Sequence, residues 1–480
     1  MIFIYDLLYI KMLPKNLKYT SKIESQMAKS MRSNIAPQNG TGPYGLGDTI
    51  IINIPTRNNL VLSTTESYLK FNLNLTNTSG NPASFRLDSC GAHGIISRIR
   101  IFSGSNLLQD IAEYGLLAKF LFDLQVPYDA VTGKYSTLAG TRADQSITFP
   151  ATALVNGTDL ATTTALANDL KLQLSNAKVS FNVTNSGEFL GTVNNNATTA
   201  TRTYCLNLIS LIGTLSSSNY FPLFAASSAP LRVEIQLVDS IQKTICCNGT
   251  ATIAVSNCEY VGSFIELSDE AVGMIYSSLG GSPLQFVVPD YRNYQYNFQL
   301  TNGTASQVNF QIPAKFSSLK SLYATQRDKG TGASSFFPLS SVHKGIVDYY
   351  FRVGAQIMPT KSPNTLPEMF SELLKSVGSM SDLNHHPAID FPTYSLIDSL
   401  QDGHTNPTIS SGSFYIGLDL ESYSNSDKSS IFQGYNSNTD DISLVINYNG
   451  TGSTSNVRYD CFAAFDTVVV FENNTCYVKF

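Results

Sequence analysis

The stretch LKFNLNL at residues 69–75 has an apolar side chain at every second position. LRVEIQL at 231–237 repeats this alternation, and so do YQYNFQL at 294–300 and ISLVINY at 442–448 in the second half of the chain. Successive side chains of a β-strand point to opposite faces, so each stretch predicts a strand with one buried face. Such strands occur in both halves, and each half therefore needs a partner sheet to cover its apolar faces.

The composition also favours an all-β protein of more than one domain. Only 14% of the 480 residues are charged, against roughly 25% in ordinary soluble domains. The chain has 27 Phe and 25 Tyr but no Trp, and Asn, Ser, Thr and Gly supply much of its polarity. Aromatic residues suit pleated faces while Asn, Ser and Gly close turns. A chain of this length exceeds the usual size of one hydrophobic core, so we expect two domains.

A first helix is predicted after the alternating segment Arg98–Ile101. Asp110 and Glu113 have the spacing of a capping box, in which two side chains bond to the backbone N–H groups that open a helix. The residues that follow place an apolar stripe on one helix face: Leu117, Phe120, Leu121 and Leu124.

A second helix is predicted on the same plan, after the alternating segment 351–357. Thr365 and Glu368 form the box, Pro367 lies in the first turn, and Gly378 ends the helix. Its apolar stripe comprises Leu366, Met369, Phe370, Leu373, Leu374 and Val377. A strand, a short connection and a helix thus occur twice, about half the chain apart, which indicates a duplicated fold.

This duplication predicts the domain organisation. We expect an N-terminal arm at 1–44, a first domain at 45–240, a linker at 241–257 and a second domain at 258–480. Long polar loops at 126–168, 185–201 and 422–440 must leave a closed β-sandwich at its ends, so we expect them on an outer surface.

The N-terminal arm is basic although the whole chain has a formal net charge of −5. Residues 1–33 carry six cations against Asp6 and Glu24, namely Lys11, Lys15, Lys18, Lys22, Lys29 and Arg32. Two interpretations stay open: a solvated flexible arm, or an arm that lies on a polyanion or a membrane. Met27 and Met31 are alternative starts. The first residues make a poor signal peptide, and no later stretch has the roughly 18 apolar residues of a membrane span.

A glycine motif offers a candidate cofactor site. Gly40, Gly42 and Gly45 have the spacing of a dinucleotide-binding fingerprint. That fingerprint follows a strand and opens a helix, whereas this one contains Pro43 and precedes the apolar run 50–54. We therefore interpret it as a hinge into a strand, with no cofactor.

Histidines and cysteines offer candidate metal ligands. His385 and His386, near Asp382 and Asp390, are adjacent and point apart in either regular structure, so a solvated loop is favoured over a shared metal ion. The remaining candidates lack paired C-x-x-C spacing: Cys246, Cys247 and Cys258. We expect no metal, no catalytic residue and free thiols at all seven cysteines, which also include Cys90, Cys205, Cys461 and Cys476.

Several segments, in this order, resemble the double jelly-roll major capsid proteins of the adenovirus and tectivirus lineage, particularly the Polinton and adintovirus type. They are SYLKFNLNLT, IISRIRIFSGSNLLQDI, YYFRVGAQIMPTKSP, FYIGLDLES, SIFQGYNSNT and DCFAAFDTVVVFENNTCYVKF. The resemblance covers about residues 45–480. It implies two tandem eight-stranded jelly-roll β-sandwiches with a few short helices in the connecting loops.

The resemblance also implies a structural function and no enzyme activity. Three copies would form a pseudo-hexagonal capsomer, and many capsomers an icosahedral shell of a DNA virus. Partners would be other copies, penton and minor capsid proteins, and the genome or an internal membrane through the arm, with no small-molecule substrate. A minor capsid or spike protein, a β-sandwich glycan-binding adhesin and a carbohydrate-active enzyme are the alternatives.

Overall fold

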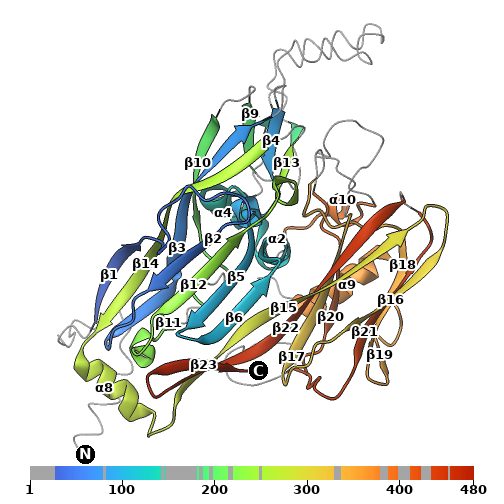
Figure 1. Ribbon diagram of the computed structural model, residues 1–480. Helices are drawn as coiled ribbons and strands as arrows, with labels where there is room; N and C mark the ends of the chain where they lie inside the picture. Colours follow the sequence, from blue (N-terminus) through green and yellow to red (C-terminus); the bar gives the residue numbers. More distant parts are fainter. Residues whose placement is uncertain are drawn as a thin grey trace, which may run out of the picture.

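Two β-sandwiches stand side by side in the computed structural model (Figure 1). The structure describes residues 28–78, 83–141, 146–147, 181–182, 188–193, 198–213, 220–247, 251–328, 337–378, 387–397, 411–422, 434–451 and 454–480.

The first sandwich has eight principal strands in two sheets. In chain order they are β1 (Ala28–Ile35), β2 (Thr49–Ile54), β3 (Leu60–Asn77), β5 (Ile96–Ser103), β6 (Asn106–Ala112), β10 (Thr198–Leu206), β12 (Leu231–Leu237) and β14 (Ala251–Leu267). One sheet has the order β1-β14-β3-β10 and the other β2-β12-β5-β6.

The second sandwich repeats this arrangement strand for strand. Its strands are β15 (Leu284–Leu300), β16 (Ser306–Ile312), β17 (Leu319–Asp328), β18 (Ile346–Val353), β19 (Gln356–Met358), β20 (Tyr415–Asp419), β21 (Ile442–Tyr448) and β22 (Ser455–Glu472). They form the sheets β15-β22-β17-β20 and β16-β21-β18-β19. In both sandwiches the first, eighth, third and sixth strands share one sheet, and the second, seventh, fourth and fifth share the other, which is a jelly roll.

Shorter elements connect or extend these strands. The short strands are β4 (Ala83–Leu87), β7 (Ser146–Ile147), β8 (Phe181–Asn182), β9 (Phe189–Val193), β11 (Tyr220–Phe221), β13 (Ile245–Cys247) and β23 (Thr475–Lys479). The helices are η2 (Gly91–Ile95), α2 (Tyr114–Gln125), α3 (Tyr128–Thr132), α4 (Lys134–Ala139), η3 (Leu223–Ala226), η4 (Ile241–Lys243), α8 (Asp269–Ser278), α9 (Leu366–Val377) and α10 (Phe391–Tyr394). Among the described residues, no helix has the length and apolar character needed to cross a bilayer.

The predicted strand alternation is confirmed in β3, β12 and β21, where the apolar residues face the core of each sandwich. The stretch 294–300 also lies in a strand, β15, but its aromatic row is less buried than the pattern suggests. Tyr296 is 40% exposed and stacks on Phe310 with ring centroids 5.2 Å apart. The reason is position, because β15 is the edge strand of its sheet and has a neighbour on one side only.

The capping box predicted for the first helix is wrong. Asp110 lies in β6, where its carboxylate forms two hydrogen bonds with the Arg98 guanidinium, of 2.7 and 2.6 Å. The hairpin β5–β6 continues to Ala112, so Asp110 is a strand residue and cannot open a helix. Helix α2 starts after Glu113, whose backbone is left-handed at φ 52° and whose side chain makes no capping hydrogen bond.

The second predicted helix is confirmed in its bounds, because α9 begins after Thr365 and ends before Gly378. Its box is only partly formed. Thr365 makes no side-chain capping hydrogen bond, and Glu368 Oε2 accepts a bond of 3.1 Å from the N–H of Asn364. Met369 and Leu373 are buried as the stripe predicts. In contrast, every residue from Tyr114 to Leu124 of α2 is buried, so α2 has no polar, solvated side.

The strands occupy parts of the expected arm and linker. Residues 28–35 form β1, the first strand of the first jelly roll, which pairs along its length with β14. The expected linker at 241–257 contains η4, β13 and the beginning of β14, which pairs with β3. Between the eighth strand of the first jelly roll and the first strand of the second lies α8.

Candidate assembly surfaces

The two jelly rolls meet along a contact that we call the seam, where β6 and α2 lie against the sheet β15-β22-β17-β20. A buried amide and carboxylate join β6 to β15. Gln109 Nε2 donates to Asp290 Oδ1 over 2.9 Å, and Gln109 Oε1 accepts from the N–H of Leu211 over 2.7 Å. Burial raises the pKa of Asp290 to about 6, because the low-polarity surroundings disfavour its charged form.

A buried ion pair on α2 continues the seam. Lys119 Nζ lies 3.1 Å from Asp123 Oδ2 and donates to Ser413 Oγ of the second jelly roll over 3.3 Å. Asp123 Oδ2 also accepts from the hydroxyls of Ser413 and Tyr415, each over 2.7 Å. Lys119 is 0% exposed, so this pair is shielded from water. Such a pair costs desolvation energy, and its fixed partners restrict how the two jelly rolls can be oriented.

Aromatic packing surrounds this pair. Phe120 of α2 packs against Tyr323 of β17, with ring centroids 4.5 Å apart, and against Tyr415 of β20 at 5.1 Å. Tyr323 in turn donates its hydroxyl to the carbonyl of Ser376 in α9. The outward face of this sheet is therefore covered by α2 from one jelly roll and α9 from the other.

The start of α2 adds a charged contact. Glu113 Oε1 lies 2.8 Å from Arg458 Nη2 of β22, and its Oε2 lies 3.3 Å from Arg327 Nη2 of β17. Arg327 is already paired with Asp460 over 2.7 Å. Glu113 thus binds two arginines of the second jelly roll. Asp460 of the same sheet partly neutralises the charge of one of them, Arg327.

The corresponding sheet of the first jelly roll has an outward side that no other described element covers, which we call the polar face. Lys70 Nζ pairs with Glu259 Oε1 over 2.7 Å, with exposed side-chain fractions of 40% and 25%. Asn74 donates to Ser256 over 2.7 Å, and the exposed Arg32 of β1 lies over the Tyr68 ring at 5.6 Å. By comparison, the stretch Tyr459–Thr467 of β22 is buried at every residue.

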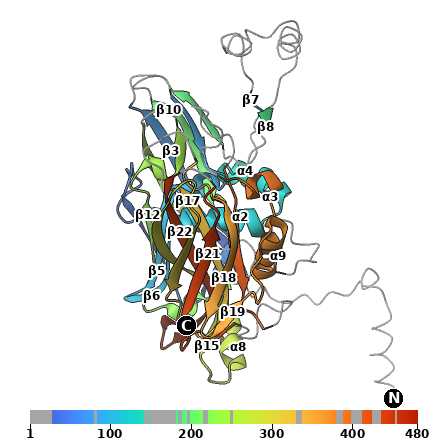
Figure 2. The same cartoon turned by 90° about the vertical axis from the view of Figure 1, so that its right-hand side faces the viewer.

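A second partly exposed surface lies on the second jelly roll. It consists of α9 and the edge strand β19, which we call the α9 flank; Figure 2 shows α9 at the side of the second jelly roll. Ile357 is 46% exposed, Lys375 is exposed, and Lys375 Nζ pairs with Glu372 Oε1 over 2.6 Å.

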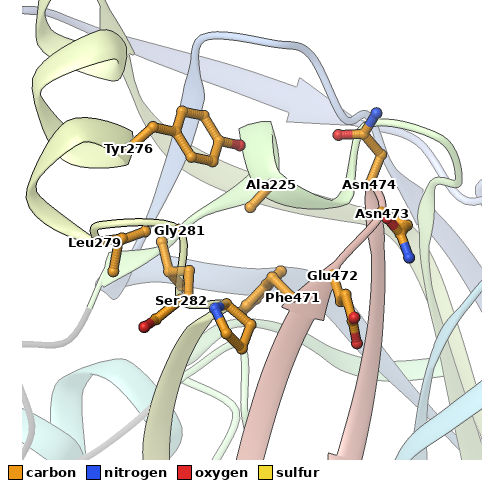
Figure 3. A pocket seen from close by; sticks show the side chains of 11 residues that line it. Ala225, Tyr276, Leu279, Gly281, Ser282, Phe471, Glu472, Asn473 and Asn474 are labelled. Carbon is orange, nitrogen blue, oxygen red and sulfur yellow. The ribbon is translucent and has the colours of Figure 1, made fainter.

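A cavity of about 390 Å³ lies between α8 and the turn that joins β22 to β23 (Figure 3). Tyr276 comes from α8, and Phe471 and Glu472 come from the end of β22. The carboxylate of Glu472 accepts from the Tyr477 hydroxyl over 2.9 Å. The described residues that line it include no nucleophile hydrogen-bonded to a base.

The glycine motif connects two strands. Gly40, Gly42 and Gly45 lie between β1 and β2, so no helix follows them. Gly42 has φ +101°, and a Cβ there would lie 2.6 Å from the carbonyl oxygen of Val255 in β14. The glycine is needed for close backbone approach within the first jelly roll.

The other candidate residues are dispersed. His385, His386 and Asp382 lie outside the described residues, and Asp390 caps α10 by accepting from the N–H of Thr393 over 3.0 Å. Cys246 and Cys247 lie in β13, whereas Cys258 is buried in β14. Within the part of the chain that the structure describes, no three His, Cys, Asp or Glu residues gather as metal ligands would.

The seam residues were missed at the sequence level. Glu113 was assigned to a cap, although its carboxylate binds two arginines more than 200 positions away. One signal was available, since Lys119 and Asp123 interrupt an otherwise apolar helix at positions i and i+4. A charged pair on a helix that has no other charged positions indicates a buried contact on that side too.

Comparison with known proteins agrees with this fold. The chain matches no protein-family model and no curated protein sequence. Among solved structures it resembles a chain of the Sputnik virophage, with a TM-score of 0.55 and 11% identity over 98% of this chain and 92% of that one. It also resembles the Faustovirus major capsid protein, with a TM-score of 0.54 and 10% identity over 97% and 94%.

The mavirus major capsid protein is similar as well, with a TM-score of 0.51 and 10% identity over 98% of this chain and 95% of that one. At such low identity the likeness shows the fold alone. The fold predicted from the sequence, an all-β chain of two tandem jelly rolls with a few short helices, is confirmed by these neighbours and by the strand order.

Proposed function

We propose that this chain is a major capsid protein of a DNA virus, of the Polinton and adintovirus type, whose copies form trimeric, pseudo-hexagonal capsomers of an icosahedral shell. One observation carries the proposal. The chain contains two jelly rolls of identical strand order, joined by a buried seam. Similarity to capsid proteins over nearly the whole chain supports it.

The physical argument concerns symmetry. Because each chain contains two similar jelly rolls, a trimer contains six of them. Six similar units arranged in a ring give a roughly hexagonal particle, and such particles can pack side by side over a surface. Each contact between capsomers can be weak, because many of them act together across a shell. A protein with this task needs stable units and extensive outer surfaces, and it needs no catalytic group.

We also propose a division of the chain that follows the strands. The first jelly roll comprises residues 28–267, α8 lies in the connection, and the second jelly roll comprises residues 284–480. These bounds differ from the expected 45–240 and 258–480, because β1 and β14 both complete the first set of eight strands.

The partners in this proposal are other copies of the chain, together with penton and minor capsid proteins in the virion. The basic segment before β1 would contact the genome or an internal membrane. No small-molecule substrate, cofactor or metal takes part, and the protein is not an enzyme.

The mass of the purified protein in solution tests the proposal. Light scattering after gel filtration is expected to give three times the chain mass of 52.3 kDa, and electron microscopy to show six-sided particles. A mass of one chain at every concentration would exclude the capsomer. The copy number in purified particles separates a major capsid protein from a minor capsid or spike protein.

A further inference from the structure

We infer that, in the free chain, the cavity between α8 and the β22–β23 turn binds the N-terminal apolar residues of the same chain. We call this cavity of about 390 Å³ the α8 cavity and residues 2–13 the apolar segment. The inference goes beyond the proposed function and does not depend on it. Four observations support it: the exposure of α8, the lining of the cavity, the place where β1 begins and the composition of the residues before β1.

Helix α8 presents apolar side chains that the described residues leave largely uncovered. None of its ten residues is buried, whereas α2 is buried over almost its whole length and α9 buries part of its apolar stripe. Met274 and Tyr276 are 52% and 46% exposed, although the Tyr276 ring also contacts the Phe224 ring at 5.8 Å. Exposed apolar side chains that gather on one element indicate a binding surface.

The α8 cavity has an apolar lining and an open side. Tyr276 and Leu279 line it from α8 and the residue after it, and Phe471 lines it from the end of β22 (Figure 3). A Cβ added to Gly281 would meet no described atom within 4 Å beyond its chain neighbours, so the cavity is open there. Its volume is within the roughly 300–1,000 Å³ of pockets that bind small ligands, which leaves room for a few apolar side chains.

The residues before β1 join the described structure beside α8. Ala28 is the first residue of β1 and pairs with Leu267, and the next residue, Ser268, caps α8. An extended stretch of the length of residues 14–27 can span up to about 50 Å, whereas a helix of ten residues is only about 15 Å long. The apolar segment is therefore long enough in its connection to reach the α8 cavity of its own chain.

The apolar segment has side chains suited to this cavity. Ten of its twelve residues are apolar, and the exceptions are Asp6 and Lys11. A run of large apolar side chains such as Phe3, Ile4 and Leu7 is unfavourable in water. Placing some of them in the cavity would remove apolar surface from water on the segment and on α8 together.

The charges around the cavity agree with this occupant. Residues 11–22 contain four lysines and no acid. Asp269 and Glu270 are exposed in the first turn of α8, and Glu472 is exposed on the β22 side of the cavity. The lysine-rich stretch would pass these carboxylates between β1 and the cavity, and complementary charges favour this path over other surfaces.

Tryptophan fluorescence tests the inference in the full-length chain, because the sequence contains no tryptophan. Tyr276→Trp places a single indole in the cavity lining. Tyr128→Trp in α3 is the matched control, since the two tyrosines are 46% and 43% exposed to begin with. Acrylamide should quench the Tyr276→Trp chain at least about threefold less than the Tyr128→Trp chain, because a covered ring is removed from water.

Substitutions before β1 then identify what covers the indole. Adding Phe3→Ser and Leu7→Ser to Tyr276→Trp should raise its quenching to that of the Tyr128→Trp chain. Adding Asn16→Ser and Thr20→Ser instead should leave the protection unchanged, because these residues lie outside the apolar segment. Melting curves by circular dichroism must match those of the original chain, and Leu279→Trp replaces Tyr276→Trp if that variant fails to fold.

Carbodiimide coupling gives a second measurement on the unsubstituted chain. The reagent joins an amine to a carboxylate in direct contact, and mass spectrometry of the digested protein should find Lys11 or Lys15 joined to Glu270 or Glu472. Equal quenching of the Tyr276→Trp and Tyr128→Trp chains, with no such joined peptide, overturns the inference. Protection that survives Phe3→Ser and Leu7→Ser also overturns it, and protection that is lost on dilution assigns the cover to another copy instead of the same chain.

Discussion

Asp290, the carboxylate buried in the seam, should make the protein less stable as the pH rises. The pKa of this group is raised from 3.8 to about 6 by burial, so the folded chain holds the proton more tightly than the unfolded chain does. The free-energy cost of ionising the buried Asp290 is absent below about pH 3.8. It grows between about pH 3.8 and pH 6 and reaches its full value above that range. At 1.36 kcal/mol for each pKa unit, the ionised carboxylate costs about 3 kcal/mol at pH 8.

Asp290→Asn removes this penalty and keeps the main contacts. The amide oxygen can still accept from Gln109 Nε2 and from the N–H of Tyr291, which lie 2.9 and 2.8 Å from Oδ1. Asp290 lines a small void together with Thr467, whose buried hydroxyl makes no hydrogen bond to the described residues.

Urea denaturation at a fixed protein concentration measures the effect. The free energy of unfolding of Asp290→Asn should exceed that of the original chain by about 3 kcal/mol at pH 8, and the difference should shrink towards zero as the pH falls to 4. Gln109→Glu is a useful companion, because it places a second carboxylate beside the first and should enlarge the pH dependence. A difference that is the same at pH 4 and pH 8 would refute the reasoning, since a change in packing alone has no such pH profile.

Three further predictions concern residues of the first jelly roll. Lys119→Met leaves the carboxylate of Asp123 without its cation and should lower the free energy of unfolding by about 3–5 kcal/mol in urea titrations; a loss below 1 kcal/mol would mean that hydroxyls alone satisfy that carboxylate. Burial lowers the pKa of His93 to about 3, so the unfolded chain takes up this proton first and stability falls as the pH drops below 6.5. Between pH 7 and pH 5 His93 should contribute a loss of about 2 kcal/mol, measured as the difference between the pH profiles of the original chain and His93→Gln, in which the opposite contribution of Asp290 cancels. Gly42→Ala should be less stable than Gly40→Ala in thermal melts, since both glycines have positive φ but only Gly42 has backbone within 4 Å of an added Cβ; equal melting temperatures would contradict the steric reason.

The seam also bears on how a shell could be built from this chain. Its buried pair of Lys119 and Asp123 and its aromatic packing are internal, so they form as the chain folds and do not depend on concentration. The polar face is exposed among the described residues. Under the proposed function, folding of the two-unit block and assembly of its copies would be separate steps.

Local chemistry was sufficient to predict the regular elements. In β3, β12 and β21 the side chains alternate between core and surface, and this alternation is a property of neighbouring residues that sequence displays directly. The bounds of α9 followed from Gly378 and the apolar stripe for the same reason. The order of such elements along the chain was enough to indicate the duplication, whereas the jelly-roll fold followed from the resemblance to capsid proteins.

Tertiary structure decided everything that depends on residues far apart in the chain. Asp110 has the spacing of a helix cap, yet its pairing with Arg98 across a hairpin holds it in β6. Nothing near Glu113 in the sequence shows that its carboxylate contacts Arg327 and Arg458. The sequence of β1 is typical of a polar arm, and only its pairing with β14 identifies it as a strand. Alternation and capping depend on neighbouring residues. The elements that cover each sheet are determined by packing between distant segments, which come together only in the folded chain.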